Sequence, residues 1–178
     1  MRKILFLLSV FLFVSADVVE WSYFQKDDTN AKIKAVYIYN FTRYFEWPSN
    51  KLEGNFVIST VGSNTGLSAE LQKLAEKKTV GSQKIELKNV SSLSDAGACN
   101  IIYLLGDNSS SLKDAVSKYK GKGTLVICDK AGMAKAGAVI NFIIDDNKQT
   151  FELNTTSATK VGLKVSGNLK DLAKSVYN

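Results

Sequence analysis

The chain has 178 residues, of which 45% are hydrophobic and 22% are charged, and its formal net charge is +6. These values are typical of a globular protein and exclude a disordered or collagen-like chain, and the length fits one domain or two small ones. There is no histidine, and the two cysteines are Cys99 and Cys128, which removes Ser-His and Cys-His catalytic pairs and leaves too few thiolates for a metal site. We therefore expect a protein that is not an enzyme, with no catalytic residues, no metal and no cofactor.

The first 16 residues have the parts of a secretory signal peptide. Arg2-Lys3 precedes an apolar run of 11 residues at 4–14, and small side chains at Val14 and Ala16 form a cleavage site before Asp17. A membrane-spanning helix needs about 20 apolar residues, so this run is too short for an anchor. We expect residues 1–16 to be removed and residues 17–178 to form one exported domain that does not span the membrane.

Removal of this leader leaves 21 basic and 17 acidic residues, a net charge of +4, with Arg43 as the only arginine. The lysines are scattered along the chain, whereas nucleic-acid sites favour arginine and aromatic side chains gathered on one face. A nucleic-acid partner is therefore not expected.

A helix is predicted from Thr29 to Phe45, because apolar side chains recur there with a period of 3.6 residues. Pro48 disfavours helix at Trp47 and ends it. We expect the apolar stripe to face the core, and Asn40, its one polar member, to be buried and hydrogen-bonded to the backbone. Residues 17–28 are too mixed to assign to an element. The stripe consists of Ile33, Val36, Tyr37, Asn40, Phe41, Tyr44 and Phe45.

Strands and helices then alternate with short connections. This order predicts an α/β fold: a three-layer sandwich with a mainly parallel sheet and an antiparallel β-hairpin at one edge. A final helical region follows Asn154 and breaks at Gly162 and near Gly167. The strands are predicted at 55–61, 84–90, 101–105 and 124–128, the hairpin at 139–153, and the other helices around 67–75 and 109–119.

Polar residues follow three of these strands, at 62–64, at 106–108 and at Asp129, and such folds bind ligands at the carboxyl ends of their strands. One interpretation makes Asp107 and Asp129 an acid–base or metal pair. The other, which we favour, is that these residues start turns and cap helices. The glycines of residues 62–66 match neither common nucleotide-binding motif. A small-molecule site in this crevice is kept as the alternative to a protein-binding function.

Cys99 opens one predicted strand and Cys128 closes the next. If the two strands are parallel neighbours, Cys99 lies level with about Thr124, roughly 13 Å from Cys128, which is beyond disulfide reach. We expect two buried free thiols.

The aromatic segment that ends the first helix carries a family resemblance. Residues 34–41 (KAVYIYNF), followed by Phe45-Glu46-Trp47-Pro48, resemble the opening motif of the YfiR family of bacterial periplasmic proteins. Residues 137–142 and 151–154 are similar to the late hairpin of that family, and residues 162–166 with Leu169 are similar to its closing motif. The match keeps its order from about Thr29 to Ala173 and departs at Ala138-Val139, where the family often has Gly-Met.

The resemblance implies a non-catalytic periplasmic regulatory protein that binds and modulates an envelope signalling partner. The founding member of the family represses a membrane diguanylate cyclase, so the expected partner is such a cyclase, in cyclic-di-GMP signalling, or a sensor kinase; a homodimer is left open. Because this chain has only two cysteines, redox control through paired disulfides, a property of the founding member, is not expected. Six of the candidates for partner binding match the opening motif; Arg43 is added as a residue type common in interfaces. These candidates are Tyr39, Asn40, Phe41, Arg43, Glu46, Trp47 and Pro48.

Overall fold

The computed structural model describes the backbone of residues 15–178 and the side chains of residues 29–178. The apolar run of the predicted leader, residues 4–14, lies outside the described residues. Within the described part, no helix combines the length and hydropathy that a membrane crossing needs.

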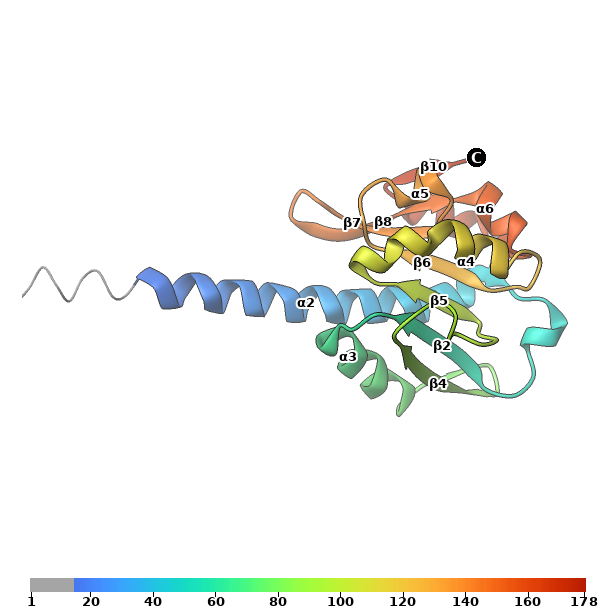
Figure 1. Cartoon of the computed structure of the whole chain (residues 1–178), viewed down its shortest axis with the longest axis horizontal. Helices are drawn as coiled ribbons and strands as arrows, with labels where there is room; N and C mark the ends of the chain where they lie inside the picture. The colour runs from blue at the N-terminus through green and yellow to red at the C-terminus, as the bar shows by residue number, and fades with distance from the viewer. Residues whose placement is uncertain (1–14) are drawn as a thin grey trace, which may run out of the picture.

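One eight-stranded sheet, in the order β10-β8-β7-β6-β5-β2-β4-β3, forms the middle of the molecule (Figure 1). Strands β4, β2, β5, β6 and β7 are parallel neighbours, and β8 pairs antiparallel with β7. This confirms the predicted mainly parallel sheet with an antiparallel hairpin, although the short β10 extends the sheet beyond the hairpin. The strands are β2 (Phe56–Val61), β3 (Thr79–Val80), β4 (Gln83–Val90), β5 (Ile101–Leu104), β6 (Leu125–Cys128), β7 (Ile140–Asp145), β8 (Lys148–Asn154) and β10 (Ser175–Tyr177).

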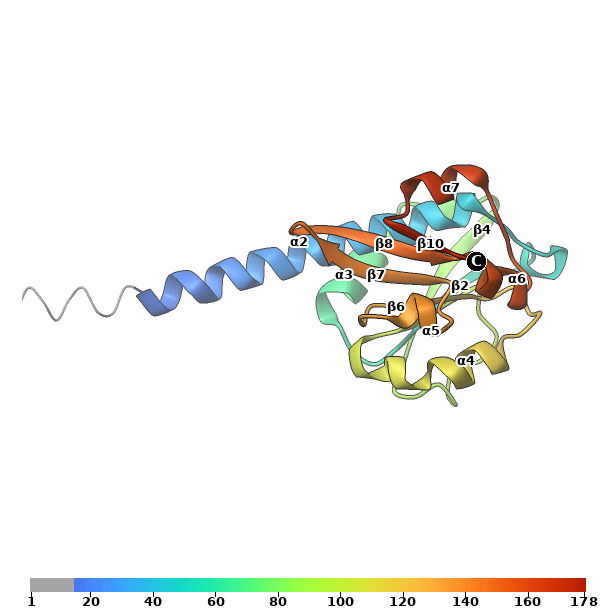
Figure 2. The same ribbon diagram turned by 90° about the horizontal axis from the view of Figure 1, so that it is seen from above.

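Helices cover both faces of the sheet, which confirms the three-layer prediction. Figure 2 shows α2 and α7 on one face and α4 and α5 on the other. The crossovers from β2 to β4 and from β5 to β6 run in opposite directions, so right-handed connections put α3 and α4 on opposite faces. The helical elements are α2 (Ser15–Tyr44), η1 (Ser49–Lys51), α3 (Thr65–Ala75), η2 (Gly106–Ser111), α4 (Leu112–Lys118), α5 (Met133–Ala136), α6 (Thr155–Lys160) and α7 (Gly167–Leu172).

Helix α2 ends within a residue of the predicted position, but its buried face is not the predicted stripe. The buried positions follow one another at i, i+4, i+7 and i+10, and they begin with Ala31 and Ala35. Val36 is 49% exposed, and Ile33, Tyr37 and Asn40 are only partly buried. Alanine lets a helix approach its neighbours closely, so two small residues mark the first half of this contact face and larger apolar residues mark the second. The described buried face consists of Ala31, Ala35, Ile38 and Phe41, with Thr42 beside it and Phe45 just beyond the helix.

The prediction that Asn40 is buried is wrong. Asn40 lies on the partly exposed side of α2, and its side chain makes no hydrogen bond to another described residue. The prediction failed because the buried face is rotated relative to the predicted stripe: Phe41 and Phe45 of that stripe are buried, but Val36 and Asn40 lie outside the buried face.

Two short strands, β1 (Phe45–Glu46) and β9 (Lys164–Val165), form a separate antiparallel ribbon that the sequence did not predict. Phe45 pairs with Val165, and the Ser166 amide donates to the Tyr44 carbonyl over 2.9 Å. Two-residue strands leave no period to detect. The ribbon ties the end of α2 to a segment about 120 residues later in the chain.

Both cysteines are buried free thiols, as predicted. The register places Cys128 opposite Leu104, whereas Cys99 lies beyond the other end of β5. Burial raises the pKa of Cys99, and it raises the pKa of Cys128 from 9.0 to about 12.

Cys128 should make the fold sensitive to alkaline pH. Above the ordinary thiol pKa of 9.0 the unfolded chain releases this proton while the native state keeps it, so stability is present below pH 9 and falls as the pH rises towards 12. At about pH 10.5 this linkage corresponds to about 2 kcal/mol. The test is to measure the free energy of unfolding in urea at about pH 7.5 and at about pH 10.5. Between these two values the wild type should lose about 2 kcal/mol more stability than Cys128→Ala, which lacks the thiol. Equal losses in the two proteins would show that Cys128 is not protected from ionisation.

Candidate functional site

The polar strand ends at the carboxyl edge of the sheet come together as predicted. Asp129, directly after β6, accepts hydrogen bonds from the Gly106 amide at 2.8 Å and from the Tyr103 hydroxyl at 3.0 Å. Gly62, after β2, has a φ of +94° and lies so close to the loop after β5 that a Cβ there would be 2.4 Å from Asn108 Nδ2. Glycine is therefore required at this position, and the loops close on one another rather than leaving a phosphate cradle.

Local structural roles account for most of these polar residues. Asn64 caps α3 by accepting from the Leu67 amide at 2.9 Å. Asp107 is fully exposed and pairs with Lys130 over 3.2 Å. Asp107 and Asp129 therefore serve different partners, and the two carboxylates do not form the acid–base pair that was one interpretation of the sequence.

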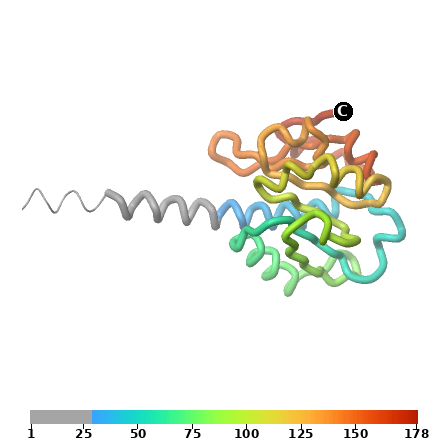
Figure 3. Tube along the Cα trace, in the orientation of Figure 1, coloured from blue at the N-terminus to red at the C-terminus, as the bar shows by residue number. Residues whose placement is uncertain are grey.

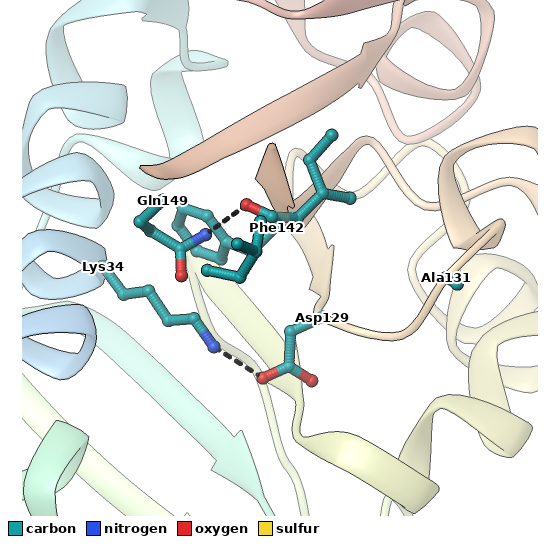
Figure 4. A pocket seen from close by; sticks show the side chains of 7 residues that line it. Lys34, Asp129, Ala131, Phe142 and Gln149 are labelled. Carbon is teal, nitrogen blue, oxygen red and sulfur yellow. Dashed lines mark hydrogen bonds and ion pairs between the residues drawn. The ribbon is translucent and has the colours of Figure 1, made fainter. Parts of the chain in front are cut away.

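Asp129 instead binds a lysine from the first helix, as Figure 4 shows. Lys34 Nζ lies 2.9 Å from Asp129 Oδ2, and the two side chains are only 16% and 13% exposed. Burial and the Asp129 charge raise the pKa of Tyr103 well above its ordinary value, so this hydroxyl stays a donor. Sequence reasoning missed Lys34, because its partner Asp129 lies 95 residues later in the chain and no local pattern links the two.

A pocket of about 280 Å³ opens beside this ion pair. Lys34 and Asp129 supply its charged wall, and β7 supplies an apolar one that includes Phe142 and the 50%-exposed Ile144 (Figure 4). Gln149, from β8, donates to the Ile143 carbonyl over 2.9 Å and lines the same pocket. The pocket thus combines one ion pair with apolar surface at the end of the sheet where α/β folds bind ligands.

A second hollow, of about 260 Å³, lies on the partly exposed side of α2. We call this side the outer face of α2; it is lined by Lys32, Ile33, Val36, Tyr37 and Asn40. These positions recur at i, i+3, i+4 and i+7, so they form one continuous stripe along the helix. The stripe is apolar except at its ends. Val36, at its centre, is exposed, whereas Tyr37 borders the buried side and also contacts the β7–β8 hairpin.

The opposite side of α2 is fixed by aromatic packing against the β7–β8 hairpin. Phe41 is buried, and its ring lies 5.1 Å from that of Phe151 and 6.0 Å from that of Phe142. Tyr37 contacts the same two rings at 5.4 and 6.0 Å. In Figure 3, the blue part of α2 passes between α3, in green, and this hairpin, in orange. Phe41, a predicted partner-binding residue, is therefore part of the core.

Trp47 and Pro48 also pack inward. Trp47 is partly buried, its ring stands edge-on to Phe56 at 5.1 Å, and its Nε1 donates to the Thr42 carbonyl over 3.1 Å. Pro48 lies against Gly123, where an added Cβ would come within 2.3 Å of the proline ring. Both residues therefore connect the end of α2 to the sheet.

Four of the predicted partner-binding residues, Tyr39, Asn40, Arg43 and Glu46, do reach solvent around the end of α2. Arg43 is exposed and stacks over the Tyr39 ring at 5.1 Å, and the Tyr39 hydroxyl donates to the Thr79 carbonyl over 3.2 Å. Glu46 is exposed and pairs with Lys164 at 3.2 Å. Tyr39 and Asn40 are partly exposed. The four side chains lie around the end of α2, outside the buried face that contains Phe41.

The three motifs that carry the family resemblance meet in space. The opening motif pairs with the closing motif through β1 and β9, and it packs on the late hairpin through Phe41. These motifs therefore describe one packing unit around the end of α2 rather than three separate sites.

The Lys34–Asp129 pair gives a prediction about stability. Asp129→Ala leaves a buried ammonium, a hydroxyl and an amide without their acceptor and should cost about 3–5 kcal/mol of unfolding free energy. Lys34→Met leaves Asp129 with two donors and should cost about 1–3 kcal/mol. The exposed Asp107→Ala is the matched control and should change stability by no more than about 0.5 kcal/mol. Denaturant unfolding measures all three, and an Asp129→Ala cost no larger than that of Asp107→Ala would contradict this account.

Comparison with one solved structure supports the fold. The structure titled as the ABC domain in complex with L-Trp from Streptococcus pneumonia has a TM-score of 0.50 and 13% identity, covering 68% of this chain and 56% of its own. A conserved domain protein from Vibrio cholerae O1 biovar El Tor str. N16961 has a TM-score of 0.48 and 15% identity, covering 68% and 54%. This chain therefore spans little more than half the length of either structure. The first of them is an α/β domain like this one.

No curated protein sequence matches the chain. The model of the YfiR/HmsC-like family, in contrast, matches residues 31–174, which include the packing unit, the whole sheet apart from β10, and both hollows. The resemblance read from the three motifs is thereby confirmed, and the chain belongs to the YfiR/HmsC-like family.

Proposed function

We propose that this protein is a non-catalytic regulator that binds a membrane diguanylate cyclase from the periplasm and modulates its activity. At the level of the family, membership supports a periplasmic regulator of diguanylate cyclase. The outer face of α2 is the feature from which we assign the contact to particular residues.

This face has the properties of a docking surface. It presents Val36 at 49% exposure beside the partly exposed Ile33 and Tyr37, and apolar side chains that reach solvent on one face are characteristic of interaction sites. Its last member, Asn40, has hydrogen-bonding groups that no described residue uses. The helix is held from behind by Phe41, so the face is rigid before binding, which lowers the ordering cost of association.

The predicted partner-binding residues then divide into two groups. We propose that Asn40, Tyr39, Arg43 and Glu46 take part in the contact, because they border the outer face or the exposed end of α2. Phe41, Trp47 and Pro48 support that surface from the core.

A charge placed on the outer face should break the contact. Val36→Lys should reduce recovery of a tagged cyclase co-expressed in the envelope at least about tenfold, because it puts an ammonium in the centre of an apolar interface. Leu172→Lys is the matched control: Leu172 is 52% exposed on α7, so the chemical change is the same on another surface. Cellular cyclic-di-GMP, measured in the same strains, should change with Val36→Lys and not with Leu172→Lys. Equal recovery with the two variants would remove the outer face of α2 from the interface.

A small-molecule sensor is the second candidate function, and the 280 Å³ pocket beside Lys34 and Asp129 favours it. The pocket offers both signs of charge and an apolar wall, a combination suited to a small amphipathic ligand. Native mass spectrometry of protein purified from the periplasm would reveal such a ligand as a constant added mass. A bound ligand together with no cyclase recovery would favour this function over partner binding.

A further inference from the structure

A third hollow, of about 180 Å³, lies at the opposite edge of the sheet from Asp129, beside the amino ends of β5 and β6. Three lysines from three different segments line it: Lys51 at the end of η1, Lys118 at the end of α4, and Lys122 in the loop before β6. The remaining lining residues, among them Tyr119 and Thr124, carry no charge. No acidic side chain lines the hollow.

The ammonium groups are held in place by neutral oxygen atoms. Lys51 Nζ donates to the Cys99 carbonyl at 2.5 Å and to Thr124 Oγ1 at 3.4 Å. Lys118 Nζ donates to three carbonyls, those of Leu93 at 2.7 Å, Ser94 at 3.5 Å and Ala96 at 2.5 Å. These bonds fix two long, flexible side chains, so the charges are already positioned without a bound partner.

The same charges lack compensation. Among the described residues, none of the three lysines forms an ion pair, whereas the half-buried Lys34 at the other edge has Asp129. The carboxylate of Asp95, in the loop beside Lys118, accepts instead from Ser92 at 2.7 Å. Burial and the nearby Lys122 charge lower the pKa of Lys51, which agrees with an excess of positive charge at this point.

We propose that this hollow is a binding site for a small phosphate-type oxyanion, held by Lys51, Lys118 and Lys122. Three ammonium groups around one hollow match a dianion. Lys51 has two acceptors in the protein and Lys122 has none among the described residues, so both keep a proton to donate, and Lys118 adds its positive charge. The hollow is smaller than the roughly 300–1,000 Å³ of pockets that enclose drug-sized ligands, so it suits inorganic phosphate or the terminal group of a phosphomonoester rather than a whole nucleotide. The site does not depend on the proposed cyclase contact, because it shares no residue with the outer face of α2.

Titration calorimetry with inorganic phosphate, at constant ionic strength set by chloride, tests the proposal. The wild type should give a saturable one-site heat, and Lys51→Met and Lys118→Met should each weaken binding about tenfold or more. Lys122→Met should weaken it too, and it is the safer variant because Lys122 is exposed and holds no carbonyl. Lys113→Met, a change on the exposed side of α4, is the matched control and should bind like the wild type. Glycerol 3-phosphate in place of phosphate distinguishes an ester ligand from the free ion.

A second measurement separates binding from loss of fold. In the wild type, phosphate should shift the NMR signals of the Lys51 and Lys118 side chains and raise the pH at which Lys51 titrates, while the Lys113 signals stay in place. No saturable heat with the folded wild type, or equal affinity in the wild type and the folded Lys122→Met, would overturn the proposal.

Discussion

The packing of Phe41 between two rings of the β7–β8 hairpin is the contact on which the rest of the structure depends. It fixes which side of α2 faces the sheet, and the rotation of the helix then decides everything else it presents. Lys34 is directed at Asp129, Thr42 meets Trp47, and Val36 is left in solvent. The β1–β9 ribbon stops the helix from turning about its axis, because it pairs Phe45, the residue after Tyr44, with Val165 of the closing motif.

The two sides of α2 therefore have different roles: one packs on the sheet, and we assign the other to partner binding. The buried side carries small and aromatic residues in contact with the fold, and the outer side carries an apolar stripe with the exposed Val36 at its centre. The two ends of the parallel strands also differ from each other. Near the carboxyl edge the buried lysine has a carboxylate, whereas near the amino edge three lysines face only neutral groups. We assign both the apolar outer face of α2 and the three lysines without a carboxylate to binding partners.

The sequence predicts the sheet well because its strands are short apolar runs bounded by glycine and polar residues, and local patterns suffice for them. It also predicts that the strand ends meet, since parallel topology brings them to one edge. It fails on the rotation of α2: counting large apolar residues selected Ile33 and Val36, whereas Ala31 and Ala35 are the buried positions of that part of the helix. The Lys34–Asp129 pair and the β1–β9 ribbon join residues about 95 and 120 positions apart, and no local pattern encodes such contacts.

A double-mutant cycle between Phe41→Leu and Phe151→Leu tests most directly whether this aromatic contact joins the first helix to the late hairpin. The rings stand edge to face at 5.1 Å, so the unfolding free energies should be non-additive by about 0.5–1.5 kcal/mol. Leu112, buried under α4 on the other face of the sheet, provides the control pair, and Phe41→Leu with Leu112→Ala should add within about 0.5 kcal/mol. Additivity of Phe41→Leu and Phe151→Leu, with both variants folded, would contradict the packing unit on which the account depends.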